Sequence, residues 1–141
     1  MYHKNAKAYK RDNLEAELSV ADPHRIIQLL MQGVLERLAR AKGAMARRDF
    51  ETKGDAISGC MAILNSLQDS LDLSQGKIAE DLYALYGYMK DKLREASLKL
   101  DPDMIDEVAN LMITIKSGWD AIPDSEKQKG YQLREQLGEL K

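Results

Sequence analysis

The stretch that decides the fold is "IAEDLYALYGYMKDKLREASLKL", which spans residues 78–100. An α-helix advances by about 100° per residue, and at that period most apolar side chains of the stretch fall within an arc of about 100°. They are Ile78, Leu82, Leu85, Tyr86, Met89, Leu93, Ala96 and Leu100. A single apolar stripe of this length predicts a long helix that buries one face.

Three of the six tyrosines of the chain lie within this stretch, at positions 83, 86 and 88. They cannot share one helix face, because Tyr83 and Tyr88 point about 100° and about 120° away from the stripe, on opposite flanks. We therefore predict that Tyr86 belongs to the core and that the other two tyrosines lie on the surface.

Two Asp-Pro pairs, at residues 22–23 and 101–102, mark the starts of the first and last predicted helices. An Asp side chain accepts hydrogen bonds from the free amides of a helix start, and Pro at the first helical position loses no bond. The first helix is predicted to reach about Ala46, and Pro123 ends the last one. The core-facing residues of the last helix are then Met104, Ile105, Val108, Leu111, Met112, Ile115 and Trp119.

The second helix is predicted over residues 50–71, where apolar residues repeat every seven positions with two more beside them. Its stripe consists of Ile57, Cys60, Leu64, Leu67 and Leu71. Ser74 is predicted to cap the third helix. Short connections make successive helices antiparallel neighbours, so the sequence predicts an all-α, antiparallel up-and-down four-helix bundle.

The 141 residues fit one domain with a single core. We assign residues 1–123 to a single helical-bundle domain, in which residues 1–20 form an N-terminal arm or short helix. Residues 124–141 form a polar C-terminal tail, in which leucines at helical spacing leave a short C-terminal helix as an alternative.

Composition argues against several classes of partner. The net charge is only −2, with both signs interspersed, so the chain has no electrostatic reason to bind nucleic acid or an anionic membrane. The most apolar run, residues 26–31, is far shorter than the ~20 residues that span a bilayer, and the first twelve residues lack the apolar core of a signal peptide. We expect a soluble, cytoplasmic protein without membrane insertion.

No arrangement of residues typical of a catalytic or metal site is found. His3 and His24 lack co-ligands, and His24 is predicted to lie near solvent in the first turn of a helix. Cys60 lies on an apolar stripe and is predicted to be a buried, unreactive thiol. We therefore expect no enzyme, no metal and no cofactor.

Several apolar side chains remain outside the four stripes: Met31, Leu35, Ile63, Tyr83, Tyr88 and Ile113. If they lie together on the surface, they form a patch of the size that marks a protein partner site. The alternative is that the N-terminal arm covers them permanently through Tyr9, Leu14 and Leu18. Periodicity alone leaves both interpretations open.

The order of five motifs resembles the flagellin-specific export chaperones of the FliS family. These are "AKAY", "ADPHRIIQLLMQGVLERLARAK", "KGDAISGCMAILNSLQDSLDL", "LYALYGYM" and "WDAIP". The resemblance covers roughly residues 1–123. It implies a cytosolic, non-enzymatic chaperone that binds the disordered C-terminal segment of flagellin, prevents premature polymerisation and delivers flagellin to the flagellar type III export gate.

The resemblance also implies roles for particular residues. Tyr9 matches the family tyrosine associated with docking to the export-gate protein, and Ala6 stands where relatives can carry a bulky aliphatic residue. The implied flagellin-binding groove comprises Met31, Leu35, Ile57, Met61, Ile63, Leu64, Leu82, Tyr83, Tyr86 and Tyr88. A structural or adaptor bundle that homodimerises through its surplus apolar surface, when unliganded, is the alternative.

Overall fold

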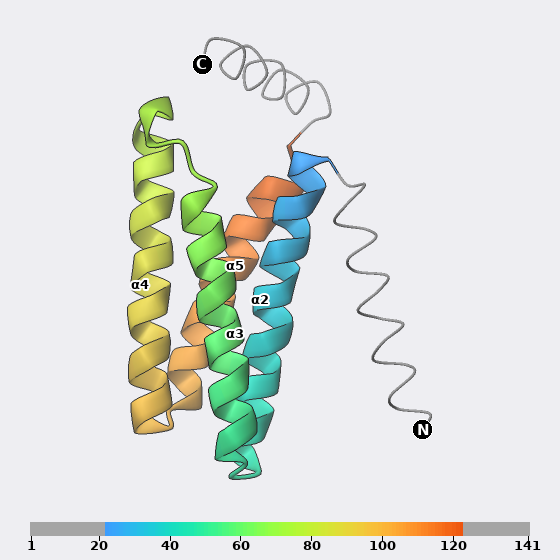
Figure 1. Cartoon of the computed structure of the whole chain (residues 1–141), viewed down its shortest axis with the longest axis vertical. Coiled ribbons are helices and arrows are strands. Elements are labelled where there is room, and N and C mark those ends of the chain that lie inside the picture. Colours follow the sequence, from blue (N-terminus) through green and yellow to red (C-terminus); the bar gives the residue numbers. More distant parts are fainter. Residues whose placement is uncertain (1–21, 123–141) are drawn as a thin grey trace. The chain divides into compact units, whose positions relative to one another are not determined.

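The computed structural model describes residues 22–122, and these are all-helical, with no strand among them (Figure 1). The elements are α2 (Pro23–Ala46), α3 (Phe50–Asp69), the 3-10 helix η1 (Leu73–Gln75), α4 (Lys77–Lys99) and α5 (Pro102–Asp120). The prediction of four long helices is confirmed. The predicted N-terminal arm and C-terminal tail lie outside the described residues.

The described residues fall into two parts. One is Leu30–Asp120, and the other contributes residues 22–29 and 121–122. Within Leu30–Asp120 the helices alternate in direction along the chain, and α4 packs against both α3 and α5 (Figure 1). This is the up-and-down bundle that the short connections predict.

Aspartates begin α2 and α3. The Asp22 carboxylate accepts a hydrogen bond from the backbone N–H of Arg25 at 2.8 Å. Asp49 accepts one from the N–H of Thr52 at 3.2 Å, and hydrogen bonding from Thr52 lowers the pKa of the Asp49 carboxyl. Both bonds satisfy amides that a helix start leaves without a partner, as predicted for Asp22.

The start of α4 differs from the prediction. Ser74 does not cap this helix but lies in η1, where its backbone N–H donates to the Asp72 carboxylate at 3.0 Å. The N-cap of α4 is Gly76, which has a φ of 104° and no side-chain cap bond. Because glycine alone adopts this conformation without a Cβ penalty, the chain can turn sharply here between two helices.

The end of α3 also differs slightly. The helix ends at Asp69, two residues before the predicted Leu71. The Ser70 hydroxyl donates to the carbonyl of Leu67 at 2.7 Å, and such a side-chain bond competes with continuation of the helical hydrogen-bond pattern.

The core follows the predicted stripes with two exceptions. Ile78 is 78% exposed, because it lies in the first turn of α4 where no neighbouring helix covers it. Leu100 is exposed because it follows the end of α4 in the left-handed conformation, with a φ of 53°, which takes its side chain off the stripe. The largest fully buried side chains are Met31, Val34, Leu38, Cys60, Leu64, Leu67, Met89, Leu93, Ile105, Val108 and Met112.

The prediction that His24 lies near solvent is wrong, since only 4% of its surface is exposed. Polar groups of a first turn face water only where that helix end lies at the surface, and a sequence pattern carries no information on this point.

Candidate partner-binding surface

Four of the ten predicted groove residues are core residues: Met31, Ile57, Leu64 and Tyr86. The prediction that Met31 extends past the core is wrong, because only 2% of its surface is exposed. α2 contacts α3 on one side, and its Lys42 reaches Asp106 of α5 at 2.8 Å on another. A helix between two neighbours buries a wider arc than one stripe.

The other six predicted groove residues reach the surface to different degrees. Leu35, Met61, Ile63 and Leu82 are half-buried, whereas Tyr83 and Tyr88 are each 44% exposed. The division of the three tyrosines into one core and two flank residues is thereby confirmed. Burial raises the pKa of Tyr86 to about 12. Ala6 and Tyr9, predicted to dock to the export gate, lie outside the described residues.

Tyr83 belongs to the edge between α3 and α4. The buried Gln68 of α3 donates its amide to the backbone carbonyl of Tyr83 at 3.0 Å. Farther along the same pair of helices, Lys90 donates to the side-chain oxygen of Asn65 at 2.8 Å. These bonds fix the backbone of α4 while the Tyr83 ring stays exposed.

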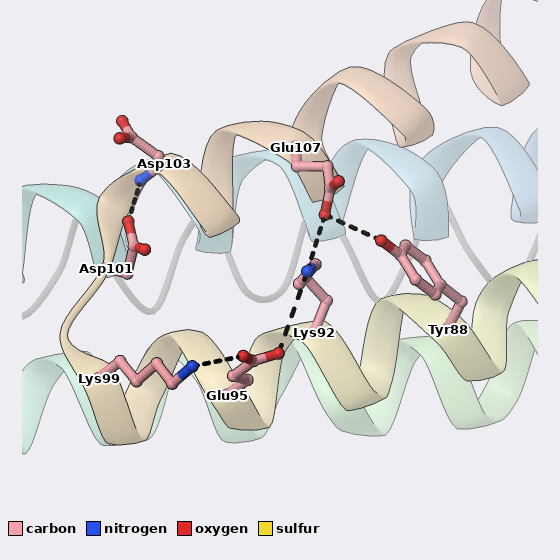
Figure 2. A network of polar contacts seen from close by, with 7 residues as sticks. All are labelled: Tyr88, Lys92, Glu95, Lys99, Asp101, Asp103 and Glu107. Atoms are coloured by element: carbon pink, nitrogen blue, oxygen red, sulfur yellow. Dashed lines mark hydrogen bonds and ion pairs between the residues drawn. The ribbon is translucent and has the colours of Figure 1, made fainter.

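Tyr88 belongs to the opposite edge, between α4 and α5, and Figure 2 shows the polar network around it. Its hydroxyl donates to the Glu107 carboxylate at 3.2 Å. The Lys92 ammonium lies 3.6 Å from Glu107 and 5.8 Å from the centre of the Tyr88 ring. Glu107, and after it Tyr88, raise the pKa of Lys92.

The network continues along α4 (Figure 2). Glu95 lies 4.0 Å from Lys92 and 2.7 Å from Lys99, and the hydrogen bond from Lys99 lowers the pKa of Glu95. At the start of α5, Asp101 accepts a bond from the backbone N–H of Asp103 at 2.9 Å. The Tyr88 hydroxyl is thus hydrogen-bonded to Glu107 of the same chain, while 44% of the Tyr88 side chain remains exposed.

The contact between α2 and α3 is made by small residues. A Cβ at Gly33 would lie 3.1 Å from the Ile63 side chain, so the helices meet closely here. The Cys60 thiol donates to the carbonyl of Val34 at 3.6 Å. Cys60 is fully buried, as predicted, and burial raises the pKa of its thiol to about 12.

Exposed apolar residues extend beyond the predicted groove. Ile113 was expected on the surface and is 49% exposed. Three other exposed apolar residues were not predicted: Phe50, Leu73 and Leu98. The exposure of Leu98 could have been predicted from the sequence, because this residue lies about 140° away from Leu93 of the apolar stripe on the helical wheel of α4.

α5 carries an open depression of about 440 Å³, and five of the six residues that line it are polar. Its lining is Asp103, Asp106, Glu107, Asn110, Leu111 and Thr114. Among residues 22–122, no three His, Cys, Asp or Glu side chains are placed to hold a metal ion. None of the residues that line this depression belongs to the groove that the sequence predicts. No helix within the described ranges is long and apolar enough to cross a membrane.

The helical architecture and the motif order agree with a comparison against known protein families. The model of the family described as "Flagellar protein FliS" matches residues 5–126. The chain belongs to the FliS family. Relatives in this family are named flagellar secretion chaperones, so the resemblance that the sequence motifs indicated is confirmed.

Individual relatives are similar to this FliS-family chain over most of its length. The flagellar secretion chaperone FliSB of Pseudomonas aeruginosa is 46% identical over 120 residues, which cover 84% of this chain and 95% of the relative. FliS of Vibrio cholerae is 39% identical, with 83% of this chain and 87% of the relative covered. FliS of Salmonella typhimurium is 36% identical, with 82% and 87% covered. Most of the tail, from residue 127 on, lies outside the family match.

Proposed function

We propose that this chain is a cytoplasmic export chaperone that binds the disordered C-terminal segment of flagellin and prevents its premature polymerisation. It then delivers flagellin to the flagellar type III export gate. The FliS match over residues 5–126 carries the proposal, together with relatives named flagellar secretion chaperone. The protein acts by binding alone, without metal or cofactor.

Exposed apolar side chains support a role in client binding. A disordered client loses conformational entropy when it becomes ordered, so affinity must come from anchors placed on apolar surface. Tyr83 and Tyr88 offer half-exposed rings, and Ile113 adds an exposed aliphatic side chain on α5. The half-buried Leu35, Met61, Ile63 and Leu82 complete the proposed contact set. In this proposal Met31, Ile57, Leu64 and Tyr86 support the groove from the core.

Delivery to the gate is assigned to the N-terminal segment. We propose that Tyr9, next to Ala6 in "AKAY", contacts the export-gate protein. Replacement of Tyr9 by Ala then weakens binding to the gate protein but leaves binding to flagellin unchanged.

The first prediction tests the client. Calorimetric titration of the full-length chain with the flagellin C-terminal segment gives a one-to-one complex, and circular dichroism shows new helix in the segment. Tyr83→Glu weakens this complex about tenfold or more, because a charge replaces an apolar anchor. The melting temperature of the variant barely changes, since 44% of the Tyr83 side chain is already exposed in the folded protein.

Two outcomes contradict this assignment. If the wild-type chain does not bind the flagellin segment at micromolar concentration, flagellin is rejected as the client. If sedimentation then shows a concentration-dependent dimer, the alternative of a structural or adaptor bundle takes its place. Wild-type affinity in Tyr83→Glu would instead remove only this residue from the groove. Ser66→Glu, at an exposed polar position on α3, is the matched control and should bind normally.

A further inference from the structure

Arg37 lies in a notch between α2 and α3 that two glycines create. Its guanidinium donates to the carbonyl of Gly33, one turn earlier on its own helix, at 3.2 Å. Its stem crosses Gly59 of α3, where a Cβ would lie 2.7 Å from the Arg37 Nε and 2.9 Å from its Cδ. Real Cβ atoms do not approach so closely, so this placement of Arg37 requires glycine at position 59.

The charge in this notch has no carboxylate partner in the part of the chain that the structure describes. Arginine has five N–H donors, and Arg37 places one of them on the Gly33 carbonyl. Several other cations of the bundle reach a carboxylate within 4.0 Å: Lys42, Lys92, Arg94, Lys99 and Lys116. Arg37 differs from them because it is half-buried and still unpaired.

The surroundings of Arg37 strengthen its attraction for an anion. Ile63 lies beside Arg37. A Cβ added at Gly33 would lie 3.1 Å from Ile63 Cδ1 and 3.2 Å from Arg37 Nη1, so both side chains border this glycine. Partial burial beside apolar groups lowers the local dielectric and strengthens a charge-assisted hydrogen bond. The positive charge of Arg37 also acts on the nearby Cys60, whose pKa it lowers against the larger effect of burial.

We infer that Arg37 is a specificity-determining contact for the client. It receives a carboxylate from an amphipathic helical stretch of the flagellin C-terminal segment, in bidentate geometry. An aliphatic side chain of the same stretch, three or four residues away, packs on Ile63, because residues at that spacing share a helix face. This inference rests on the proposed function and adds the charge that selects the bound stretch.

The test replaces Arg37 in the full-length chain. Arg37→Met keeps the stem but removes the charge, and it should weaken binding of the flagellin segment about tenfold, as expected for loss of a hydrogen bond between charged groups. Arg40→Met removes the same charge from an exposed position one turn along α2 and should stay within about twofold of wild type. Wild-type affinity should fall as NaCl rises, and the fall should be smaller in Arg37→Met.

A charge exchange identifies the partner group. Arg37→Glu should bind more weakly than Arg37→Met, and one Asp→Lys or Glu→Lys change in the segment should restore its affinity. Equal affinities of wild type, Arg37→Met and Arg40→Met would overturn the inference while the client assignment stands. If Arg37→Met lowers the melting temperature but not the affinity for the segment, the role of Arg37 is structural only, and the inference is overturned too. Failure of wild type to bind removes the proposed function, and this inference with it.

Discussion

Two contacts of the bundle are built in opposite ways. The α2–α3 seam is formed by the glycines at 33 and 59, the buried Val34 and Cys60, and the half-buried Ile63, and it brings the helices close. The α4–α5 edge, formed by Tyr88, Lys92, Glu95 and Glu107, joins its helices through polar contacts in solvent (Figure 2). A close-packed seam tolerates no added volume or charge, whereas exposed ion pairs contribute little and tolerate change.

This difference bears on how the bundle can serve a partner. Under the proposed function, a client that binds at the α4–α5 edge disturbs only weak contacts, so the Tyr88 ring can join its binding surface at little loss of stability. The α2–α3 seam must stay closed, and it offers a partner only what lies on its outer side, such as Arg37 beside Ile63. The close-packed seam and the exposed polar edge thus belong to different pairs of helices.

The largest expected effect comes from a charge in the seam. Val34 is fully buried and its carbonyl accepts the Cys60 thiol. Val34→Asp should lower the free energy of unfolding by at least about 4 kcal/mol, because an unpaired carboxylate would lie in the core. Urea denaturation followed by circular dichroism measures this loss. Ile113→Asp, at an exposed position, is the control and should stay within about 0.5 kcal/mol of wild type. Similar losses of unfolding free energy in both variants would contradict the distinction between the buried seam and the exposed surface.

An intermediate effect is expected from alkaline pH. Burial raises the pKa of Cys60 from 9.0 to about 12 and that of Tyr86 from 10.0 to about 12. Above pH 9 the unfolded thiol loses its proton while the folded one keeps it, so the unfolded state binds fewer protons. The free energy of unfolding should therefore fall as pH rises, by up to about 1.4 kcal/mol per pH unit for each such group.

Cys60→Ala isolates the part of this effect that belongs to the seam. Denaturation at pH 8, 9, 10 and 11 should show a shallower decline in Cys60→Ala than in wild type, whatever the offset between the two at pH 8. Parallel declines would mean that the thiol ionises as easily in the folded protein as in the unfolded chain.

The smallest effect is expected at the edge. Tyr88→Phe removes the hydroxyl that bonds to Glu107 but keeps the ring beside Lys92. The melting temperature should fall by no more than about 2 °C, because exposed polar pairs exchange readily with water. Measurements at 50 and 500 mM NaCl should differ little between variant and wild type. A fall as large as that of a seam variant would end the distinction between the two contacts.

Local signals predicted much of this fold correctly. The α2 start at Pro23, the α5 start at Pro102 and the division of the three tyrosines all follow from cap chemistry and the helical period. The candidate surface was predicted only in part. Tyr83 and Tyr88 are exposed as expected, but Met31 is buried because α2 has two neighbours.

What the sequence by itself determined is the number, limits and stripes of the helices, since these depend on residues within a few positions of one another. Only the tertiary structure decided which stripe ends are covered, as at Ile78, and which charges meet a partner. The notch around Arg37 joins Gly33 to Gly59, which lies on a different helix. No local pattern reports such a meeting, because it depends on how two helices pack.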